Sequence, residues 1–285
     1  EEKQRAFQSF WNKYYKVSSC AYYGDNDAYL MDKVYSVLIS GSDQIFNCTL
    51  TGNTKAYYLS FANKSKRISY ASSFGRETLT DIEHSLIKSE LSKFSAISVR
   101  EKSGADLIHS DLGVAPQLVV DPVFLLDKKK WEYMVETREP GKYILVYAME
   151  VTQQIQKAIE FASSLYRLPI ITVCGGENTV TLPGKKITTC GPELFLSFLR
   201  DADIIVTNSF HGTALSFIFG KKVIVAAHSS RNTRLENIME LTDMSSKLIL
   251  KETCVSEEYI IDGEKAYNAM TELIENSREF LKQNI

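Results

Sequence analysis

Short apolar runs alternate with helical stretches along almost the whole chain, and this alternation constrains the fold more than any other feature. In the first half the apolar runs are rich in β-branched residues and occupy positions 34–39, 68–73, 96–99 and 118–120. The second half repeats the pattern at 143–147, 169–173, 204–206 and 223–226. Such runs are typical of strands buried on both faces of a parallel sheet and connected by helices. The pattern predicts an α/β fold of two Rossmann-like, doubly wound domains that face each other across a cleft.

A charged stretch separates the two halves. Residues 127–141 contain many charged side chains and the pair Pro140-Gly141, which is typical of a linker. We therefore expect an N-terminal domain over residues 1–127 and a C-terminal domain over residues 128–285, with a final helix at 267–282 that is a candidate to return to the first domain. The chain opens with an amphipathic helix rather than a strand, so we also expect the first domain to lack its first strand.

The overall composition excludes several classes of protein. The chain has 285 residues, of which 44% are hydrophobic and 24% charged, with a formal net charge of −2. This charge provides no general attraction for nucleic acid. The apolar runs are all far shorter than the roughly 20 residues that a membrane-spanning helix needs. These values are those of an ordinary globular protein.

The cysteines and histidines are scattered along the chain. Five cysteines without the spacing of metal ligands are typical of a reducing compartment, and we expect a cytoplasmic protein. The four histidines are equally dispersed, so we expect no metal site. Of these, His228 lies just past a predicted strand and is a candidate to line the cleft.

His211 is the strongest candidate for chemistry. It follows the apolar run at 204–206 and opens an apolar helical stretch at 211–219. In open α/β sheets ligands bind beyond the carboxyl ends of the strands, where helix N-termini attract anions. An imidazole at this point can transfer protons near neutral pH. The neighbours Ser209, Gly212 and Thr213 are small and polar, which favours a site over the alternative, a core histidine bonded to a backbone carbonyl.

A second polar turn follows the first apolar run. Asp43 and Gln44 lie in this turn and could contact a ligand, although a tight turn closed by an Asx hydrogen bond is an equal alternative. The chain has neither the G-x-G-x-x-G fingerprint nor the P-loop pattern, so dinucleotide-binding and P-loop functions lack support.

Arginines follow two further predicted strands. Arg100 comes directly after the run at 96–99, where a guanidinium could bind carboxylate or phosphate. A structural salt bridge with Glu101 or Asp121 is the alternative. Arg231 and Arg234 open the helix after the last strand and form a candidate anion pocket, with an ordinary helix cap as the competing interpretation.

A set of short motifs resembles the polysaccharide pyruvyl transferase family. In chain order, the matching segments are Gly41-Ser-Asp-Gln44, Ile68-Ser-Tyr-Ala-Ser-Ser-Phe-Gly75, Ser98-Val-Arg-Glu-Lys102, Val120-Asp-Pro122, Gly191-Pro-Glu193, Thr207-Asn-Ser-Phe-His-Gly-Thr213 and Ser230-Arg231. The family resembles glycosyltransferases with two Rossmann domains, an architecture known as GT-B. Its characterised members move the enolpyruvyl unit of phosphoenolpyruvate onto a sugar, usually as a cyclic ketal.

The resemblance implies pyruvyl transfer from phosphoenolpyruvate to a sugar or lipid-linked oligosaccharide in surface-polysaccharide biosynthesis. We expect no cofactor, no nucleic-acid partner, and peripheral association with the membrane only through the acceptor. By motif match the catalytic residues are His211 and Arg100. The other expected site residues are Arg231, Arg234, Ser209, Gly212 and Thr213 for the donor, and Asp43, Gln44 and Ser73 for the acceptor or the cleft.

One departure from the family pattern keeps two alternatives open. Several members carry an arginine and a leucine just before the motif histidine, where this chain has Ser209-Phe210. The alternatives are a nucleotide-sugar glycosyltransferase of the same architecture and a family member that recognises glycans without catalysis.

Overall fold

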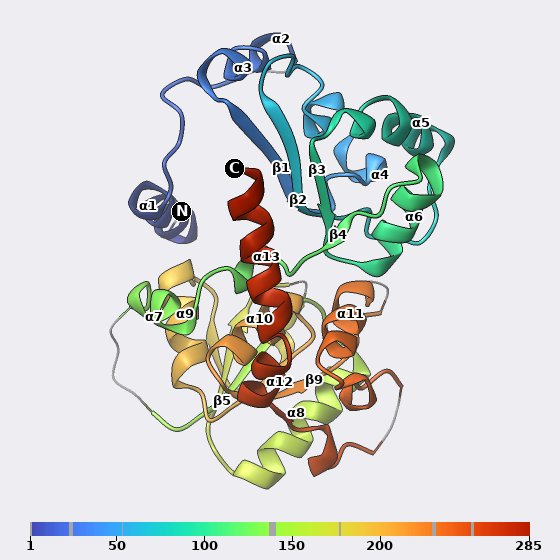
Figure 1. Ribbon diagram of the computed structural model, residues 1–285. Helices are drawn as coiled ribbons and strands as arrows, with labels where there is room; N and C mark the ends of the chain where they lie inside the picture. Colours follow the sequence, from blue (N-terminus) through green and yellow to red (C-terminus); the bar gives the residue numbers. More distant parts are fainter. Residues whose placement is uncertain are drawn as a thin grey trace. The chain divides into compact units, whose positions relative to one another are not determined.

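The computed structural model describes residues 2–22, 25–52, 54–136, 141–176, 178–229, 232–251 and 254–285 (Figure 1). The chain forms two compact units. The four-stranded unit comprises Ser18–Leu125 and Glu272–Ile285, and the six-stranded unit comprises Glu1–Val17 and Leu126–Thr271. No helix within the described ranges is long and apolar enough to cross a membrane.

This division differs from the expected one at the start of the chain. We expected residues 1–127 to form one domain, but helix α1 (Glu2–Tyr14) groups with the six-stranded unit. The reason is a contact with the start of helix α9 (Pro192–Asp201), where Lys13 Nζ lies 2.7 Å from Glu193 Oε1. At the other end of the chain, helix α13 (Thr271–Asn284) lies in the four-stranded unit apart from its first residue.

The four-stranded unit is built on a parallel sheet with the strand order β1-β2-β3-β4. Its strands are β1 (Val37–Asp43), β2 (Lys66–Ser72), β3 (Ala96–Val99) and β4 (Gln117–Leu118). The other elements are α2 (Asp25–Ala28), α3 (Met31–Val34), α4 (Cys48–Thr51), α5 (Asp81–Ser89), α6 (Lys102–Leu112), α13, and 3-10 turns at Lys55–Tyr58, Leu91–Lys93 and Pro122–Phe124. Strand β1 starts later than predicted because α3 occupies residues 31–34, and it runs on to Asp43 because this end pairs in register with β2.

Two hydrophobic clusters hold this sheet. One packs the apolar sides of α5 and α6 around fully buried aromatic and aliphatic side chains such as Phe46, Phe74 and Ile108. The other packs Phe280 of α13 against Ile68 of β2. From Ile68 onward β2 is buried on both faces, which explains why residues 68–72 form a run of apolar and small side chains rather than an alternating pattern.

The six-stranded unit has the strand order β10-β9-β8-β5-β6-β7, parallel except for β10. Its strands are β5 (Ile144–Ala148), β6 (Ile170–Cys174), β7 (Lys185–Ile187), β8 (Ile204–Thr207), β9 (Lys222–Val225) and β10 (Ile261–Asp262). The helices are α1, α7 (Lys128–Tyr133), α8 (Gln153–Tyr166), α9, α10 (Phe210–Ile218), α11 (Thr233–Leu241) and α12 (Gly263–Ala269), with 3-10 turns at Thr179–Thr181, Ser245–Lys247 and Glu257–Tyr259.

The strand order of this unit creates a switch point. From β5 the chain adds β6 and β7 on one side, and then returns to add β8 and β9 on the other. The carboxyl ends of β5 and β8 are therefore neighbours, and the helices that follow them, α8 and α10, leave from the same place. Open α/β sheets bind ligands at such a point.

Candidate functional site

The turn between β8 and α10 lies at the carboxyl edge of the six-stranded sheet. The Ser209 hydroxyl caps α10 by accepting a hydrogen bond from the Gly212 amide at 3.3 Å, and the Ser209 amide donates to Thr207 Oγ1 at 3.0 Å. His211 consequently lies in the first turn of α10 and is exposed. Its ring meets the Phe210 ring edge-on, with 5.2 Å between the ring centroids. The predicted position of His211, at a strand end and a helix start, agrees with the structure.

Three neighbours of His211 do not fit their expected role in donor binding. Thr213 is fully buried and its hydroxyl donates to the Ser209 carbonyl at 3.0 Å. Gly212 is buried, and the Ser209 hydroxyl is used as the helix cap. Consecutive residues of a helix point about 100° apart, so an exposed His211 places the two residues after it on other sides.

A cation lies near the start of α10. The guanidinium carbon of Arg234, in the first turn of α11, lies 5.9 Å from the centroid of the Phe210 ring. Arg234 is therefore close to the residue that precedes His211, as its assignment to the donor requires. Arg231 lies outside the described residues.

Residues after β5 and β9 meet at the same edge of the sheet. Glu150 Oε1 lies 3.1 Å from His228 Nδ1, and Glu150 Oε2 accepts a hydrogen bond from the Ser229 hydroxyl at 2.9 Å. Asn208, after β8, bonds to this segment by donating to the Glu150 carbonyl at 3.1 Å. His228 was a candidate to line the cleft, but its pairing with Glu150 was not predicted. The sequence signal for each residue is its place after a predicted strand, and this signal does not show that the two strand ends lie close together.

Arg100 is the centre of an ion cluster at the carboxyl edge of the four-stranded sheet. Its nitrogens Nη2, Nε and Nη1 each lie 2.9 Å from a carboxylate oxygen, of Asp43, Glu101 and Asp121 respectively. The Arg100 side chain is 4% exposed. This geometry corresponds to the salt-bridge alternative, because a donor anion could reach the guanidinium only by displacing a carboxylate. The expected direct contact between Arg100 and the donor therefore does not fit the structure.

The electrostatics of this cluster favour the charged arginine. Burial by itself would lower the pKa of Arg100, but the carboxylates of Glu101 and Asp121 outweigh burial and raise it above its ordinary value. Buried carboxylates need such a partner, since an unpaired buried charge is strongly destabilising. Arg100 thus holds together the ends of β1 and β3 and the segment after β4.

The expected acceptor residues have different surroundings. The Asp43 side chain is 66% exposed although it pairs with Arg100, and its backbone has the left-handed φ of 66°. Gln44 is partly buried and accepts a hydrogen bond from Asn47 Nδ2 at 3.1 Å. Ser73 is fully buried and donates to Glu101 Oε1 at 2.9 Å, so it cannot face a ligand. Of the three, Asp43 is the one whose position suits an acceptor contact.

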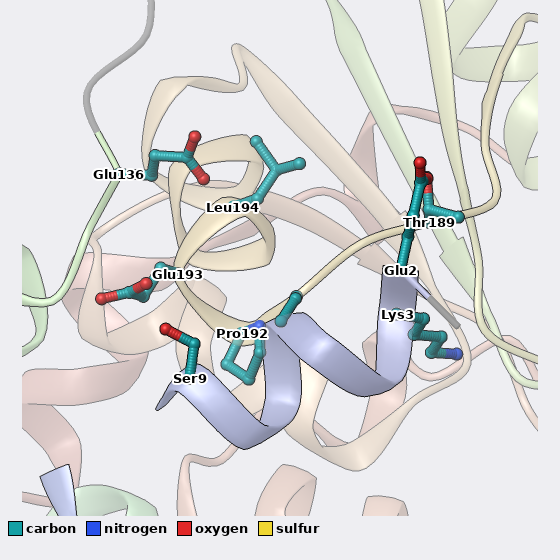
Figure 2. A pocket seen from close by; sticks show the side chains of 10 residues that line it. Glu2, Lys3, Ser9, Glu136, Thr189, Pro192, Glu193 and Leu194 are labelled. Atoms are coloured by element: carbon teal, nitrogen blue, oxygen red, sulfur yellow. The ribbon is translucent and has the colours of Figure 1, made fainter. Parts of the chain in front are cut away.

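A separate pocket of about 240 Å³ lies between α1 and the start of α9 (Figure 2). Its lining residues are Glu2, Lys3, Ala6, Ser9, Glu136, Thr189, Gly191, Pro192, Glu193 and Leu194. The Lys13 ammonium holds the pKa of Glu193 below its ordinary value, so this carboxylate is ionised near neutral pH. Three glutamates against one lining lysine make the pocket unsuitable for an anionic donor.

The described part of the chain has no group of three or more His, Cys, Asp or Glu side chains arranged to hold a metal ion. The three carboxylates that converge at the end of the four-stranded sheet do so on the Arg100 guanidinium. The five cysteines are free thiols.

Comparison with protein families decides the identity of the chain. The family model described as polysaccharide pyruvyl transferase matches residues 3–230, which include all of the motif segments except Arg231 at the end of the last one. The chain belongs to the polysaccharide pyruvyl transferase family. This confirms the resemblance seen in the sequence, and the family is one of transferases in polysaccharide biosynthesis. No curated protein gives a significant match to the sequence.

Solved structures of other proteins are similar in fold to this family member. The co-structure of Staphylococcus aureus MnaA with UDP is similar at a TM-score of 0.54 and 13% identity, over 99% of this chain and 86% of that one. UDP-GlcNAc 2-epimerase from Neisseria meningitidis bound to UDP-GlcNAc has a TM-score of 0.47 at 12% identity, over 91% and 75%. A glycosyltransferase from Rickettsia africae has a TM-score of 0.47 at 12% identity, over 97% of this chain and 83% of that one. The first likeness and the two sheets, which are parallel apart from β10, confirm the GT-B-like, Rossmann fold class.

The packing of Gly212 in this family member yields a stability prediction. A Cβ at residue 212 would lie 2.5 Å from Thr207 Oγ1 and 3.1 Å from Tyr147 Cδ1. Although alanine favours helix over glycine, we expect Gly212→Ala to lower the free energy of unfolding by about 1–3 kcal/mol through overpacking. Urea unfolding measures the change.

Gly104→Ala is the matched control. Gly104 is also in a helix, but its Cβ would meet neighbours only at 3.7 Å, an ordinary contact distance. This substitution should raise stability by about 0.5–1 kcal/mol. An equal increase in the free energy of unfolding for Gly212→Ala and Gly104→Ala would show that the β8–α10 turn is not tightly packed.

Proposed function

We propose that this protein transfers the enolpyruvyl group of phosphoenolpyruvate to a pair of sugar hydroxyls in a surface-polysaccharide precursor and closes a cyclic ketal. Membership of the family supports a transferase of polysaccharide biosynthesis. The observation that carries the finer proposal is the exposed His211 in the first turn of α10, with Arg234 near the preceding residue, Phe210. This arrangement combines a titratable group with positive charge at the carboxyl edge of a parallel sheet.

The donor requires positive charge. Phosphoenolpyruvate carries a carboxylate and a phosphate, and the N-terminus of α10 and the Arg234 guanidinium both attract anions. Such preorganised positive groups can stabilise the leaving phosphate, so the reaction as proposed uses no metal ion. Phosphoenolpyruvate is the co-substrate, and no cofactor takes part.

The chemistry also requires proton transfer. The methylene carbon of the donor must gain a proton, which produces an oxocarbenium-like centre at the neighbouring carbon. A sugar hydroxyl attacks this centre, and phosphate leaves as the second hydroxyl closes the ring. We assign the protonation of the methylene carbon to His211, since an imidazole serves as a general acid near neutral pH.

The ion cluster of the four-stranded unit is given a supporting role. Arg100 positions Asp43 by a 2.9 Å ion pair, and the exposed Asp43 carboxylate is proposed to accept hydrogen bonds from the acceptor sugar. This assignment replaces the direct contact between Arg100 and the donor. The acceptor is a sugar or a lipid-linked oligosaccharide, and peripheral association with a membrane would follow only from a lipid-linked acceptor.

One observation favours a second candidate function. The structure with the TM-score of 0.54 is a complex with UDP, so a nucleotide-sugar transferase of the same fold is the alternative. This chain has Ser209 where several family members carry an arginine. A protein that binds glycans without catalysis is therefore a third candidate.

Product analysis tests the proposal. The protein is incubated with phosphoenolpyruvate and a panel of sugar acceptors, and free phosphate and the acceptor mass are followed. We expect phosphate release that depends on the acceptor, together with a pyruvyl adduct on the sugar. Release of a nucleoside diphosphate from a sugar nucleotide, without phosphate from phosphoenolpyruvate, would instead identify a glycosyltransferase. Glycan binding without either product would identify the third function.

A further inference from the structure

We propose that Glu150 and His228 form a second proton-transfer group of this site, in which His228 acts on the acceptor hydroxyl and Glu150 positions its imidazole. The proposal rests on the proposed function and extends it, because ketal formation needs both an acid and a base. It adds two residues at the ends of β5 and β9 that the motif set does not contain.

The geometry of the pair resembles that of an imidazole oriented by a carboxylate. Glu150 Oε1 lies 3.1 Å from His228 Nδ1, and the two side chains are only 24% and 15% exposed. A carboxylate at Nδ1 favours the tautomer with its proton on that nitrogen, which makes Nε2 the basic nitrogen. The pair therefore prepares His228 to accept a proton through Nε2.

The backbone amide and carbonyl of His228 both form hydrogen bonds with the side chain of Asn232. The His228 amide donates to Asn232 Oδ1 at 2.8 Å, and Asn232 Nδ2 donates to the His228 carbonyl at 2.8 Å. Glu150 also accepts hydrogen bonds from the Ser229 amide and hydroxyl. These contacts fix the position of the imidazole, as a group that transfers protons requires.

Glu150 is itself fixed at the switch point of the sheet. Asn208, which follows the neighbouring strand β8, accepts from the Met149 amide at 2.7 Å and donates to the Glu150 carbonyl at 3.1 Å. The side chain of Asn208 thus ties the end of β5 to the end of β8. His211 lies three residues after Asn208 in the first turn of α10, so both imidazoles follow adjacent strands of one sheet edge.

Two imidazoles balance the protons of the reaction. His211 gives a proton to the methylene carbon, and His228 Nε2 takes the proton of the first hydroxyl as its oxygen bonds to the adjacent carbon. The bond from that carbon to the phosphate oxygen then breaks, and His228 returns its proton to the departing phosphate. The second hydroxyl adds to the same carbon and gives its proton to His211. Both residues end in their starting states, with ketal and hydrogen phosphate as products.

The first test reads the tautomer directly and needs no activity. In protein labelled with ¹⁵N-histidine, we expect neutral His228 to carry its proton on Nδ1, and Glu150→Ala to shift it toward Nε2. His228→Asn identifies the signal by removing it. Glu160→Ala, an exposed glutamate of α8, is the matched control and should change nothing. An Nε2-protonated His228 that is unaffected by Glu150→Ala would overturn the dyad.

The second test uses phosphate release from phosphoenolpyruvate. His228→Ala should lower kcat by about 10²- to 10⁴-fold, the usual contribution of general acid–base catalysis, with little change in KM for phosphoenolpyruvate. Added imidazole should restore part of the rate, which it would not do for a structural residue. Glu150→Ala should lower kcat less, by about 10- to 100-fold, which is the range for groups that orient metal-bound histidines.

A conservative variant separates chemistry from folding. His228→Asn can still donate to Glu150 but cannot titrate, so it should fold like the wild type and remain as slow as His228→Ala. Turnover of His228→Asn within about threefold of wild type would overturn the proposal, because general-base loss costs far more. If wild-type protein releases no phosphate with any acceptor, the proposed function fails and with it the role in ketal formation, even where the tautomer is as expected.

Discussion

Replacement of His211 by alanine is expected to lower the turnover of phosphoenolpyruvate by about 10²- to 10⁴-fold, which is the range for removal of a general acid or base. The imidazole is exposed in the first turn of α10 and the Ser209 cap holds that turn in place. Since the cap does not involve the imidazole, the variant should unfold at the same urea concentration as wild type. Acceptor-dependent phosphate release measures the rate.

The control for this result is His109→Ala. His109 is an exposed histidine of α6 in the four-stranded unit, so its loss removes an imidazole without touching the β8–α10 turn. We expect its rate to equal that of wild type. Phosphate release by the His211 variant at close to the wild-type rate would refute the assignment of the acid.

Replacement of Arg100 by methionine is expected to lower the free energy of unfolding by about 3–5 kcal/mol, the usual cost of removing one partner from a buried ion pair. The variant would leave Glu101 and Asp121 buried without their cation, as the two side chains are only 5% and 6% exposed. Urea unfolding of the variant measures this loss.

Two further variants separate the structural role of Arg100 from donor binding. Lys102→Met removes an exposed cation two residues away and should have an effect within about 0.5 kcal/mol, as is usual for surface substitutions. Adding Asp121→Asn to the Arg100 variant should recover part of the lost stability, because one uncompensated charge disappears. If the Arg100→Met protein had wild-type stability and a greatly raised KM for phosphoenolpyruvate, this result would instead support a direct contact between Arg100 and the donor.

The regular elements that could be predicted are those with a strong local pattern. Strand β8 was predicted at residues 204–206 and lies at Ile204–Thr207, because a buried central strand of a parallel sheet is a continuous apolar run. Strand β3 was likewise predicted at 96–99. Strand β7 (Lys185–Ile187) was missed, because an edge strand with two lysines lacks the continuous apolar run of a central strand.

The candidate site was predictable only in part. The place of His211 at a strand end and a helix start followed from the order of apolar runs, but the direction of each neighbouring side chain did not. Thr213 is two residues from His211 and is fully buried, because the turn of the helix points it into the protein. The pairing of Glu150 with His228 depends on β5, β8 and β9 being adjacent, which residues 78 positions apart in the chain do not reveal.

The α/β class, the organisation into two units and the family could all be predicted from the residues alone, since these depend on local apolar patterns and short motifs. The partners of the polar residues could be identified only in the folded chain. Arg100 could have bound a donor or carboxylates, and the convergence of Asp43 and Asp121 from distant strand ends decided for the carboxylates. The interaction energy of a charged group depends mainly on the charges within a few ångströms of it. Strand order, rather than separation along the chain, decides which residues those are.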